Sequence, residues 1–289
     1  MRVLYPGDES ENVIELSVIV PVFDEAATLW DMAVGLAPHL DRIVGPRRWQ
    51  FVVVDNGSTD ETPHILDRIA VSWPTVRVSL PRPDYGEAMY QGLKRAESDW
   101  AYIINVDFWD ETMVAWCWQH RGLYDLVLGS KRSDASLNQQ HTYRKLLSWG
   151  LNAILQFVFG FVGSDTHGQK FLYLPTLRPI LDQCVMRRGQ FDTELTLRAM
   201  RAGLWLAEVP VPVIELRPPR NLMFVKIYRN LVDIRRLNKV MRGVPAKSPV
   251  RYHRWAREDL LQRETIQAAA FLEAAESQRR RRLKIEYND

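Results

Sequence analysis

The chain has 289 residues, of which 46% are hydrophobic, and its lysines and arginines outnumber its acids by only 38 to 35. This length and apolar content are sufficient for one large core, or for a core with an appendage, so we expect a folded globular protein. The small excess of positive charge gives no reason to expect a nucleic-acid partner.

The two cysteines, Cys117 and Cys184, lie far apart and outside any CxxC pair. This argues against a disulfide framework and a structural zinc site, and it predicts a reducing, cytoplasmic location. The first residues, MRVLYPGDESEN, lack the pattern of a signal peptide.

Short β-branched runs alternate with helical patterns through the first half of the chain, which is typical of an α/β domain on a mostly parallel sheet. The helical stretches begin near Glu25, Glu61, Gly86 and Glu111. The predicted strands are 16–23, 51–58, 76–80, 100–107 and 123–130.

Ligands of such sheets bind at the carboxyl ends of the strands, so the polar residues that close each run are candidate site residues. Acids come first and bases later along this edge, which suggests a phosphorylated ligand held partly through a divalent cation. These residues are Asp24, Glu25, Asp55, Asn56, Arg82, Asp107, Asp110, Lys131 and Arg132.

The longest apolar stretch, LNAILQFVFGFVG from Leu151, is too short for the roughly 20 residues of a spanning helix and contains Asn152 and Gln156. It could be buried in a core or lie at a membrane surface.

The character of the chain changes near residue 222. Residues 222–242 have apolar positions at helical spacing with basic residues between them, which predicts a basic amphipathic helix. After VPAKSP, a second long helix with the basic end RRRRLK is expected from Trp255. We therefore divide the chain into a domain at 1–221 and a helical extension at 222–289.

An ordered series of motifs carries a resemblance over roughly residues 14–217. The series is LSVIVPVFDEAATL, FVVVDNGSTDET, YGEAMYQGLKRA, IINVD, VLGSKR, YRKLLSWGLN, SDTHGQKFLYLP, FDTELTLRAMRAG and EVPVPV. It resembles family 2 glycosyltransferases of the GT-A fold, in particular the polyprenyl-phosphate subgroup that includes dolichyl-phosphate mannose synthase. The resemblance implies a Rossmann-like, mixed but mostly parallel sheet flanked by helices.

The resemblance implies a donor site for a GDP- or UDP-linked sugar. Glu25 matches the acid near the nucleoside and Asp55 the residue that contacts the base. Read without the resemblance, Glu25 could be a first-turn helix acid and Asp55 part of a turn before a helix cap. The other implied donor-binding residues are Pro21, Phe23, Arg82, Gly86, Asn105, Val106 and Arg217.

The family usually has an Asp-x-Asp motif that binds a divalent cation, and here the triplet is Asn105-Val106-Asp107. We expect Mg²⁺ or Mn²⁺ with Asp107 as its main ligand and Asp110 as a second carboxylate. The alternatives are a strand-ending turn with no ion, and a helix cap at Asp110.

The acceptor phosphate of the subgroup is implied to bind Lys131, Arg132, Arg144 and Ser148. A solvated basic helix end is the alternative. A phosphate acceptor is already anionic and needs no strong general base, whereas a sugar hydroxyl would need one, with Asp165 and Glu194 as candidates. Both acids could instead be structural.

The expected function is that of an inverting, metal-dependent hexosyltransferase acting on polyprenyl phosphate at the cytoplasmic face of a membrane. The chain would bind that membrane peripherally, through its basic segments or a membrane partner subunit. Two alternatives stay open: a soluble family 2 transferase acting on a glycan or small-molecule hydroxyl, and a non-catalytic relative. The second is raised by Asn105 and by RPPRNLMF, which keeps Arg217 but lacks the usual Gly-x-Ser-Lys loop.

Overall fold

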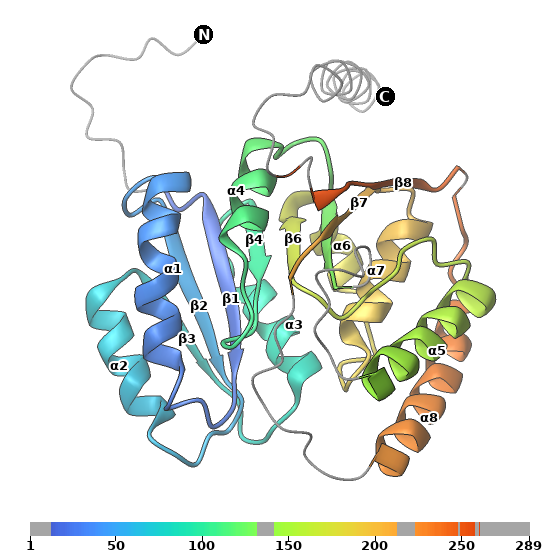
Figure 1. Ribbon diagram of the computed structural model, residues 1–289, viewed down its shortest axis with the longest axis horizontal. Coiled ribbons are helices and arrows are strands. Elements are labelled where there is room, and N and C mark those ends of the chain that lie inside the picture. The colour runs from blue at the N-terminus through green and yellow to red at the C-terminus, as the bar shows by residue number, and fades with distance from the viewer. Residues whose placement is uncertain (1–12, 132–141, 213–222, 248, 258–259, 261–289) are drawn as a thin grey trace, which may run out of the picture.

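The computed structural model describes residues 13–131, 142–212, 223–247, 249–257 and 260, without the side chains of 142–148 and 223–231. Its described part contains an eight-stranded sheet in the order β3-β2-β1-β4-β6-β5-β7-β8 (Figure 1). β6 runs antiparallel to β4 and β5, and every other neighbouring pair is parallel. The mixed, mostly parallel sheet is therefore confirmed. The strands are β1 (Leu16–Val22), β2 (Trp49–Asp55), β3 (Thr75–Ser79), β4 (Trp100–Ile103), β5 (Leu126–Ser130), β6 (Lys170–Tyr173), β7 (Trp205–Pro210) and β8 (Arg251–Arg254).

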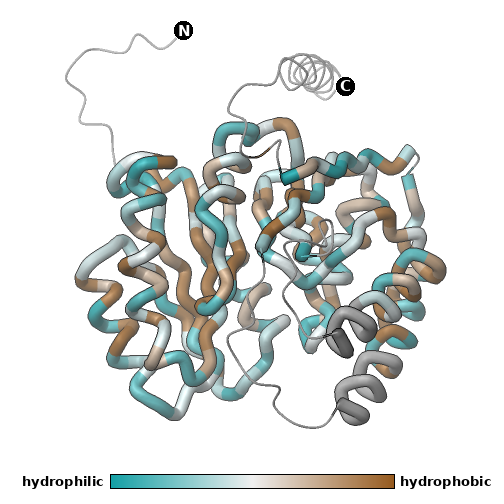
Figure 2. The backbone as a smooth tube through the Cα atoms, viewed as in Figure 1, coloured by the Kyte–Doolittle hydropathy of each residue, from teal (hydrophilic) through white to brown (hydrophobic). Residues whose placement is uncertain are grey.

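Helices cover both faces of the sheet, and each face has its own apolar core. Alternate residues of one strand serve the two cores: Val18 and Val20 of β1 belong to one, and Ile19 to the other. α1, α2 and α4 pack on the first core, and α3, α5, α6, α7 and α8 on the second. The central strands are accordingly the most hydrophobic part of the molecule (Figure 2). The helices are α1 (Leu29–Ile43), α2 (Thr62–Ser72), α3 (Tyr85–Arg95), α4 (Glu111–Gln119), α5 (Thr142–Phe159), α6 (Leu174–Leu181), α7 (Phe191–Arg201) and α8 (Met223–Met241).

All five predicted strands are present, but β4 ends at Ile103 rather than at Asp107. The reason is a tight turn, in which Asn105 and Phe108 exchange backbone hydrogen bonds. Asp107 therefore sits in a loop beyond the strand. The first helix also begins later than expected, at Leu29, because Asp24 adopts a left-handed backbone conformation with φ of 52°.

The described part of the C-terminal extension packs on the sheet domain. The basic amphipathic helix is confirmed as α8, and its residues Ile234, Leu237 and Met241 are buried in the second core. β8 then adds an edge strand beside β7, which the sequence analysis did not predict. Most of the second expected helix lies outside the described residues.

The apolar stretch after Leu151 belongs to the long helix α5 and the loop that follows it. Leu155, Phe159 and Phe161 are buried in the core, whereas Phe157 and Val158 are exposed. Among the described residues, no helix is long and apolar enough to cross a membrane.

Candidate functional site

The loops after β1 and β2 are bound together by side-chain caps. The Asp24 carboxylate accepts a hydrogen bond from the backbone N–H of Thr59 (2.8 Å), and the Asp55 carboxylate accepts one from that of Ser58 (3.0 Å). Asp55 is buried, and Glu25 accepts a hydrogen bond from the Thr28 hydroxyl (2.9 Å). The two expected donor-binding acids thus lie on adjoining loops of one edge of the sheet.

The loop after β3 closes against the same edge. The side-chain oxygen of Asn56 accepts a hydrogen bond from the backbone of Asp84 (2.7 Å), and Asp84 caps α3. Gly57 has φ of 80° and packs on the backbone of Arg82, which brings Arg82 beside the loop that follows Asp55. Gly86 leaves no room for a Cβ, because its helix packs directly against the backbone of Arg187. Pro21 is buried and Phe23 is exposed.

Asn105 and Asp107 lie at the same edge, beyond β4, with Val106 buried between them. The Tyr85 hydroxyl donates a hydrogen bond to the side-chain oxygen of Asn105 (2.7 Å). Burial raises the pKa of Tyr85, and the negative charges of Asp192 and Asp107 raise it further. Two carboxylates therefore approach this hydroxyl from different elements, Asp107 from the β4 loop and Asp192 from α7.

Asp110 is used as a helix cap, which is the alternative that the sequence left open. Its Oδ1 accepts from the N–H of Thr112 (2.9 Å), and its Oδ2 accepts from the Arg257 guanidinium (2.7 Å). The carboxyl is buried, so both of its oxygens are held by the protein. The described residues contain no cluster of three or more acids, histidines or cysteines arranged for a metal ion.

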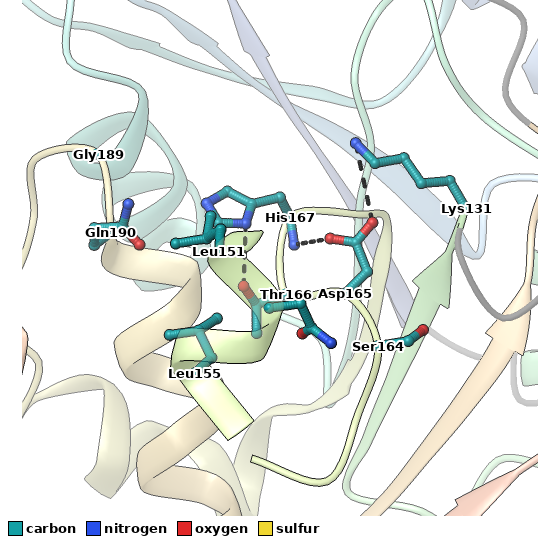
Figure 3. Close-up of a pocket in the computed structure, with 10 residues that line it drawn as sticks. Lys131, Leu151, Leu155, Ser164, Asp165, Thr166, His167, Gly189 and Gln190 are labelled. Carbon is teal, nitrogen blue, oxygen red and sulfur yellow. Dashed lines mark hydrogen bonds and ion pairs between the residues drawn. The ribbon is translucent and has the colours of Figure 1, made fainter. Parts of the chain in front are cut away.

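A pocket of about 370 Å³ lies between the end of β5, helix α5 and the loops before β6 and α7 (Figure 3). Leu151 and Leu155 supply its apolar lining, and the rest of the wall is polar. The polar lining residues are Lys131, Asn152, Ser164, Asp165, Thr166, His167 and Gln190.

Asp165 is the central acid of this pocket and is 7% exposed. Its Oδ1 accepts a hydrogen bond from the backbone N–H of His167 (2.9 Å), and its Oδ2 lies 4.0 Å from Lys131 Nζ (Figure 3). Lys131 therefore reaches the pocket, as expected from its place after β5, and it brings positive charge to Asp165, the one acid among the described residues of the lining.

The acids of α7 have different roles. Asp192 lies 3.6 Å from the buried Lys170 ammonium and 3.9 Å from His167 Nε2, so it sits beside the pocket wall. Glu194 is fully buried and accepts from the backbone N–H groups of Val185 (2.9 Å) and Met186 (2.6 Å). Arg198 Nε donates a hydrogen bond to the other carboxylate oxygen of Glu194 (2.7 Å). Glu194 therefore has the structural role that the sequence left open, and it is not among the residues that line the pocket.

Four expected binding residues cannot be placed by their side chains. Arg132 and Arg217 lie outside the described residues. Arg144 and Ser148 belong to helix α5, which supports their placement four positions apart on one helix, but their side chains are not described.

Five polar lining residues were not predicted from the sequence as binding residues: Asn152, Ser164, Thr166, His167 and Gln190. His167 could have been suspected from its place in DTHG, beside Asp165. Asn152 and Gln190 carry no such signal, because single amides on a helix and before a helix are common.

Comparison with known proteins agrees with this architecture. Residues 17–115 match the family model described as glycosyl transferase family 2. Glycosyltransferase AglD of Haloferax volcanii is 26% identical over 215 residues, which is 71% of this chain but 34% of AglD. The chain thus spans about a third of the length of that relative.

Solved structures with the same fold include glucosyl-3-phosphoglycerate synthase from Mycobacterium tuberculosis. Its complex with Mn²⁺, UDP and glucosyl-3-phosphoglycerate is 21% identical, covers 81% of both chains and gives a TM-score of 0.54. Its complex with Mn²⁺, UDP-glucose and glycerol 3-phosphate is also 21% identical, covers 81% of this chain and 82% of that one, and gives 0.55. Residues 17–115 of this chain thus match family 2 glycosyltransferases, and the sheet that they help to build has the GT-A fold of these solved structures.

Proposed function

We propose that this chain transfers a sugar from a GDP- or UDP-linked donor to a polyprenyl phosphate at the cytoplasmic face of a membrane, with inversion at the anomeric carbon. The observation that carries the proposal is the position of Lys131. Its ammonium lies at a polar pocket whose wall is helix α5, and the outer side of that helix exposes Trp149, Phe157 and Val158. One helix thus connects a site for an anion with a surface suited to a lipid.

The charge arrangement supports a phosphate acceptor. Lys131 is 22% exposed in its side chain, so it can approach an anion without leaving the pocket. A phosphate monoester is nucleophilic as it stands, and catalysis then depends on its position and on stabilising the leaving diphosphate. Two of the solved neighbours are complexes that contain UDP-glucose together with a phosphate-bearing ligand, glycerol 3-phosphate or phosphoglyceric acid.

A divalent cation fits the β4 edge. Asp107 is exposed there, and its charge reaches Tyr85 together with that of Asp192. Mg²⁺ is commonly held by one or two carboxylates together with substrate phosphates and water, so a single strong protein ligand is compatible with binding. Asp107 would hold Mg²⁺ or Mn²⁺, and the bound ion would neutralise charge on the leaving nucleoside diphosphate.

A hydroxyl acceptor is the second candidate, and one observation favours it. Asp165 Oδ2 has no hydrogen-bond partner within the described part of the chain, although the atom is buried. A carboxylate so placed could accept a proton from an attacking hydroxyl. A hydroxyl group of the donor could equally supply the hydrogen bond that Asp165 Oδ2 lacks.

A transfer assay separates these functions. UDP-glucose and GDP-mannose are offered with Mg²⁺ or Mn²⁺ and either a short polyprenyl phosphate or a simple glycoside, and the products are identified by mass spectrometry. We expect a glycosyl-phosphoprenyl product that Asp107→Ala abolishes. Lys131→Met should raise the KM for the lipid about tenfold or more, since a charged hydrogen bond contributes about 1.5–3 kcal/mol.

The control is Lys247→Met, because Lys247 is exposed and lies outside the pocket and outside α8. Transfer to the glycoside alone, with strict dependence on Asp165, would replace the lipid proposal by the hydroxyl one. Nucleotide binding without consumption of any donor would indicate a non-catalytic relative.

A further inference from the structure

Three buried oxygen atoms around the pocket have no hydrogen-bond partner within the described residues. They are Asn152 Oδ1, Asp165 Oδ2 and Gln190 Oε1. The three side chains are 7%, 7% and 2% exposed, and all three residues line the pocket. They come from separate elements: α5, the loop before β6 and the residue before α7.

These atoms would cost free energy if they stayed unpaired, because a buried acceptor without a donor keeps its full desolvation penalty. Asn152 donates through its amide nitrogen to Gly163 O (3.4 Å), which leaves its oxygen as the unpaired atom. Asp165 uses its other oxygen for the backbone of His167. The pocket therefore presents acceptors that require donors from a ligand.

The chemistry of the pocket indicates which reactant it can hold, the phosphate of the acceptor or the sugar ring of the donor. A phosphate dianion has no hydrogen to donate, and the Asp165 carboxylate would repel it. A neutral ring with several hydroxyl groups offers one donor to each oxygen, and Leu151 and Leu155 can face its C–H groups. Lys131, at 4.0 Å from Asp165, remains available to an anion beside the ring.

We propose that this pocket holds the sugar ring of the donor, with Asn152, Asp165 and Gln190 accepting hydrogen bonds from its hydroxyls. The inference rests on the proposed function, because an acceptor that is a polyprenyl phosphate has no hydroxyls to supply. It assigns Asn152 and Gln190 as determinants of sugar specificity and leaves the acceptor phosphate to Lys131.

The test compares binding of a nucleotide with and without its sugar. UDP and UDP-glucose, and GDP and GDP-mannose, are titrated calorimetrically in the presence of Mn²⁺ into the wild-type chain and into Asn152→Leu and Gln190→Met. Both substitutions nearly preserve volume and remove the acceptor oxygen. The matched control is Gln183→Met, because Gln183 is also a glutamine that precedes α7, but it is exposed and does not line the pocket.

We expect each pocket variant to weaken binding of the sugar nucleotide about tenfold while leaving the free nucleotide unchanged, because a lost hydrogen bond to a buried group is worth about that factor. The control should match the wild type. Equal losses for UDP and UDP-glucose, or a wild-type chain that gains no affinity from any attached sugar, would overturn the proposal. Because the two variants lie on different elements, misfolding of one still leaves the other as a test.

The transfer assay shows whether a negative result rejects the sugar pocket or the lipid acceptor. Lipid transfer by the wild type, with unchanged donor affinity in both variants, removes the sugar pocket and retains the function. Loss of the sugar-dependent affinity in the variants, without any transfer to lipid by the wild type, retains the pocket and removes the lipid acceptor. Variants that raise only the KM of a hydroxyl acceptor would show that the hydroxyls belong to the acceptor, and the donor placement would be wrong.

Discussion

Glu194 shows that an acid in a recognisable motif can serve the fold. Its carboxylate accepts hydrogen bonds from two backbone N–H groups and from Arg198, and it is fully buried. We predict that Glu194→Gln lowers the free energy of unfolding by about 3–5 kcal/mol, because Arg198 then loses its buried ionic partner. In addition, the amide nitrogen must face either Arg198 Nε or the two backbone N–H groups that share Oε2. Urea unfolding measures this loss.

The control for this substitution is Glu61→Gln, since the Glu61 side chain is 79% exposed. It should leave the urea midpoint nearly unchanged. If Glu194→Gln retained full stability but abolished transfer, Glu194 would be a catalytic acid after all.

His120 gives the molecule a pH dependence. Its Nδ1 must donate to the carbonyl of Trp116 (2.8 Å), and its ring stacks on that of Trp116 with centroids 4.3 Å apart. Burial lowers the pKa of His120 below its ordinary value of 6.5, and the hydrogen bond to Trp116 offsets only part of that effect. In the folded state the ring therefore resists protonation more than in the unfolded state.

The sign of the effect follows from this difference. Above about pH 6.5 His120 is neutral in both states and the pH has no effect through it. As the pH falls below that value, the unfolded chain binds the proton first, so stability decreases until the lowered pKa of the folded state is reached. We predict that His120→Gln reduces the loss of thermal stability between pH 7.5 and 5.5, whereas His64→Gln, at an exposed site, does not. Equal pH slopes for wild type and His120→Gln would contradict the prediction.

At the scale of the element, the same substitution should have opposite effects in two helices. Gly92 in α3 packs so closely on β1 that an added Cβ would overlap the Ile19 side chain, whereas a Cβ at Gly150 in α5 would meet no described atom beyond its own helix within 4 Å. Alanine favours a helix over glycine by about 1 kcal/mol at both sites. We predict that Gly150→Ala stabilises by about 0.5–1 kcal/mol and Gly92→Ala destabilises by about 1–3 kcal/mol. Thermal unfolding compares the two, and a stabilising Gly92→Ala would show that the side chains of Ile19 and Val54 can make room for the added methyl group.

Strands that are recognisable from their own residues were predicted from the sequence. A strand that forms only because a neighbouring strand pairs with it was not. The strands β1 and β2 are β-branched runs buried along their whole length, so their composition identifies them. β8 is the four residues Arg251–Arg254, and it forms a strand because β7 offers it an edge. No periodicity can be recognised in so short a polar segment.

The contact that joins β8 to the pocket could not be predicted from the sequence either. The buried Glu208 of β7 accepts hydrogen bonds from Tyr252 of β8 (2.5 Å) and from the backbone of Ser164 (2.6 Å), which lines the pocket. The C-terminal segment thus supports the loop that carries Asp165. A motif analysis could identify the acid in this loop, but the residues that hold the loop in place come from segments some 44 and 88 positions away.

At the scale of the whole molecule, the sequence predicted the site residues that follow the ends of strands. It did not predict the residues that helices contribute to the wall of the pocket. The order of the parallel strands places Asp55, Asp107 and Lys131 at carboxyl ends, and this follows from alternation of strands and helices alone. Asn152 and Gln190 reach the pocket through the packing of α5 and α7, which the sequence does not specify. The charged residues of the pocket, Lys131 and Asp165, were therefore expected from the sequence, and the structure adds the side-chain oxygens of Asn152 and Gln190.

Helices α5 and α8 pack against each other at one end of the molecule (Figure 1). Phe157 of α5 is 94% exposed and Trp149 is 62% exposed. The adjoining helix α8 exposes the bases Arg235, Arg236 and Lys239, and Arg242 is exposed just after its end. Apolar side chains beside basic ones are the combination that binds an anionic lipid surface.

We therefore predict that Phe157→Glu weakens binding to vesicles of phosphatidylcholine and phosphatidylglycerol about tenfold, since burial of an aromatic side chain is worth about 1.5–3 kcal/mol. The matched control is Val71→Glu, because Val71 is 89% exposed on α2, which packs on the opposite face of the sheet. Cosedimentation measures binding, and unfolding temperatures confirm that both variants fold. If Phe157→Glu sediments with vesicles as the wild type does, this end of the molecule is not its membrane surface, and the lipid acceptor would have to be reached through another face or a partner subunit.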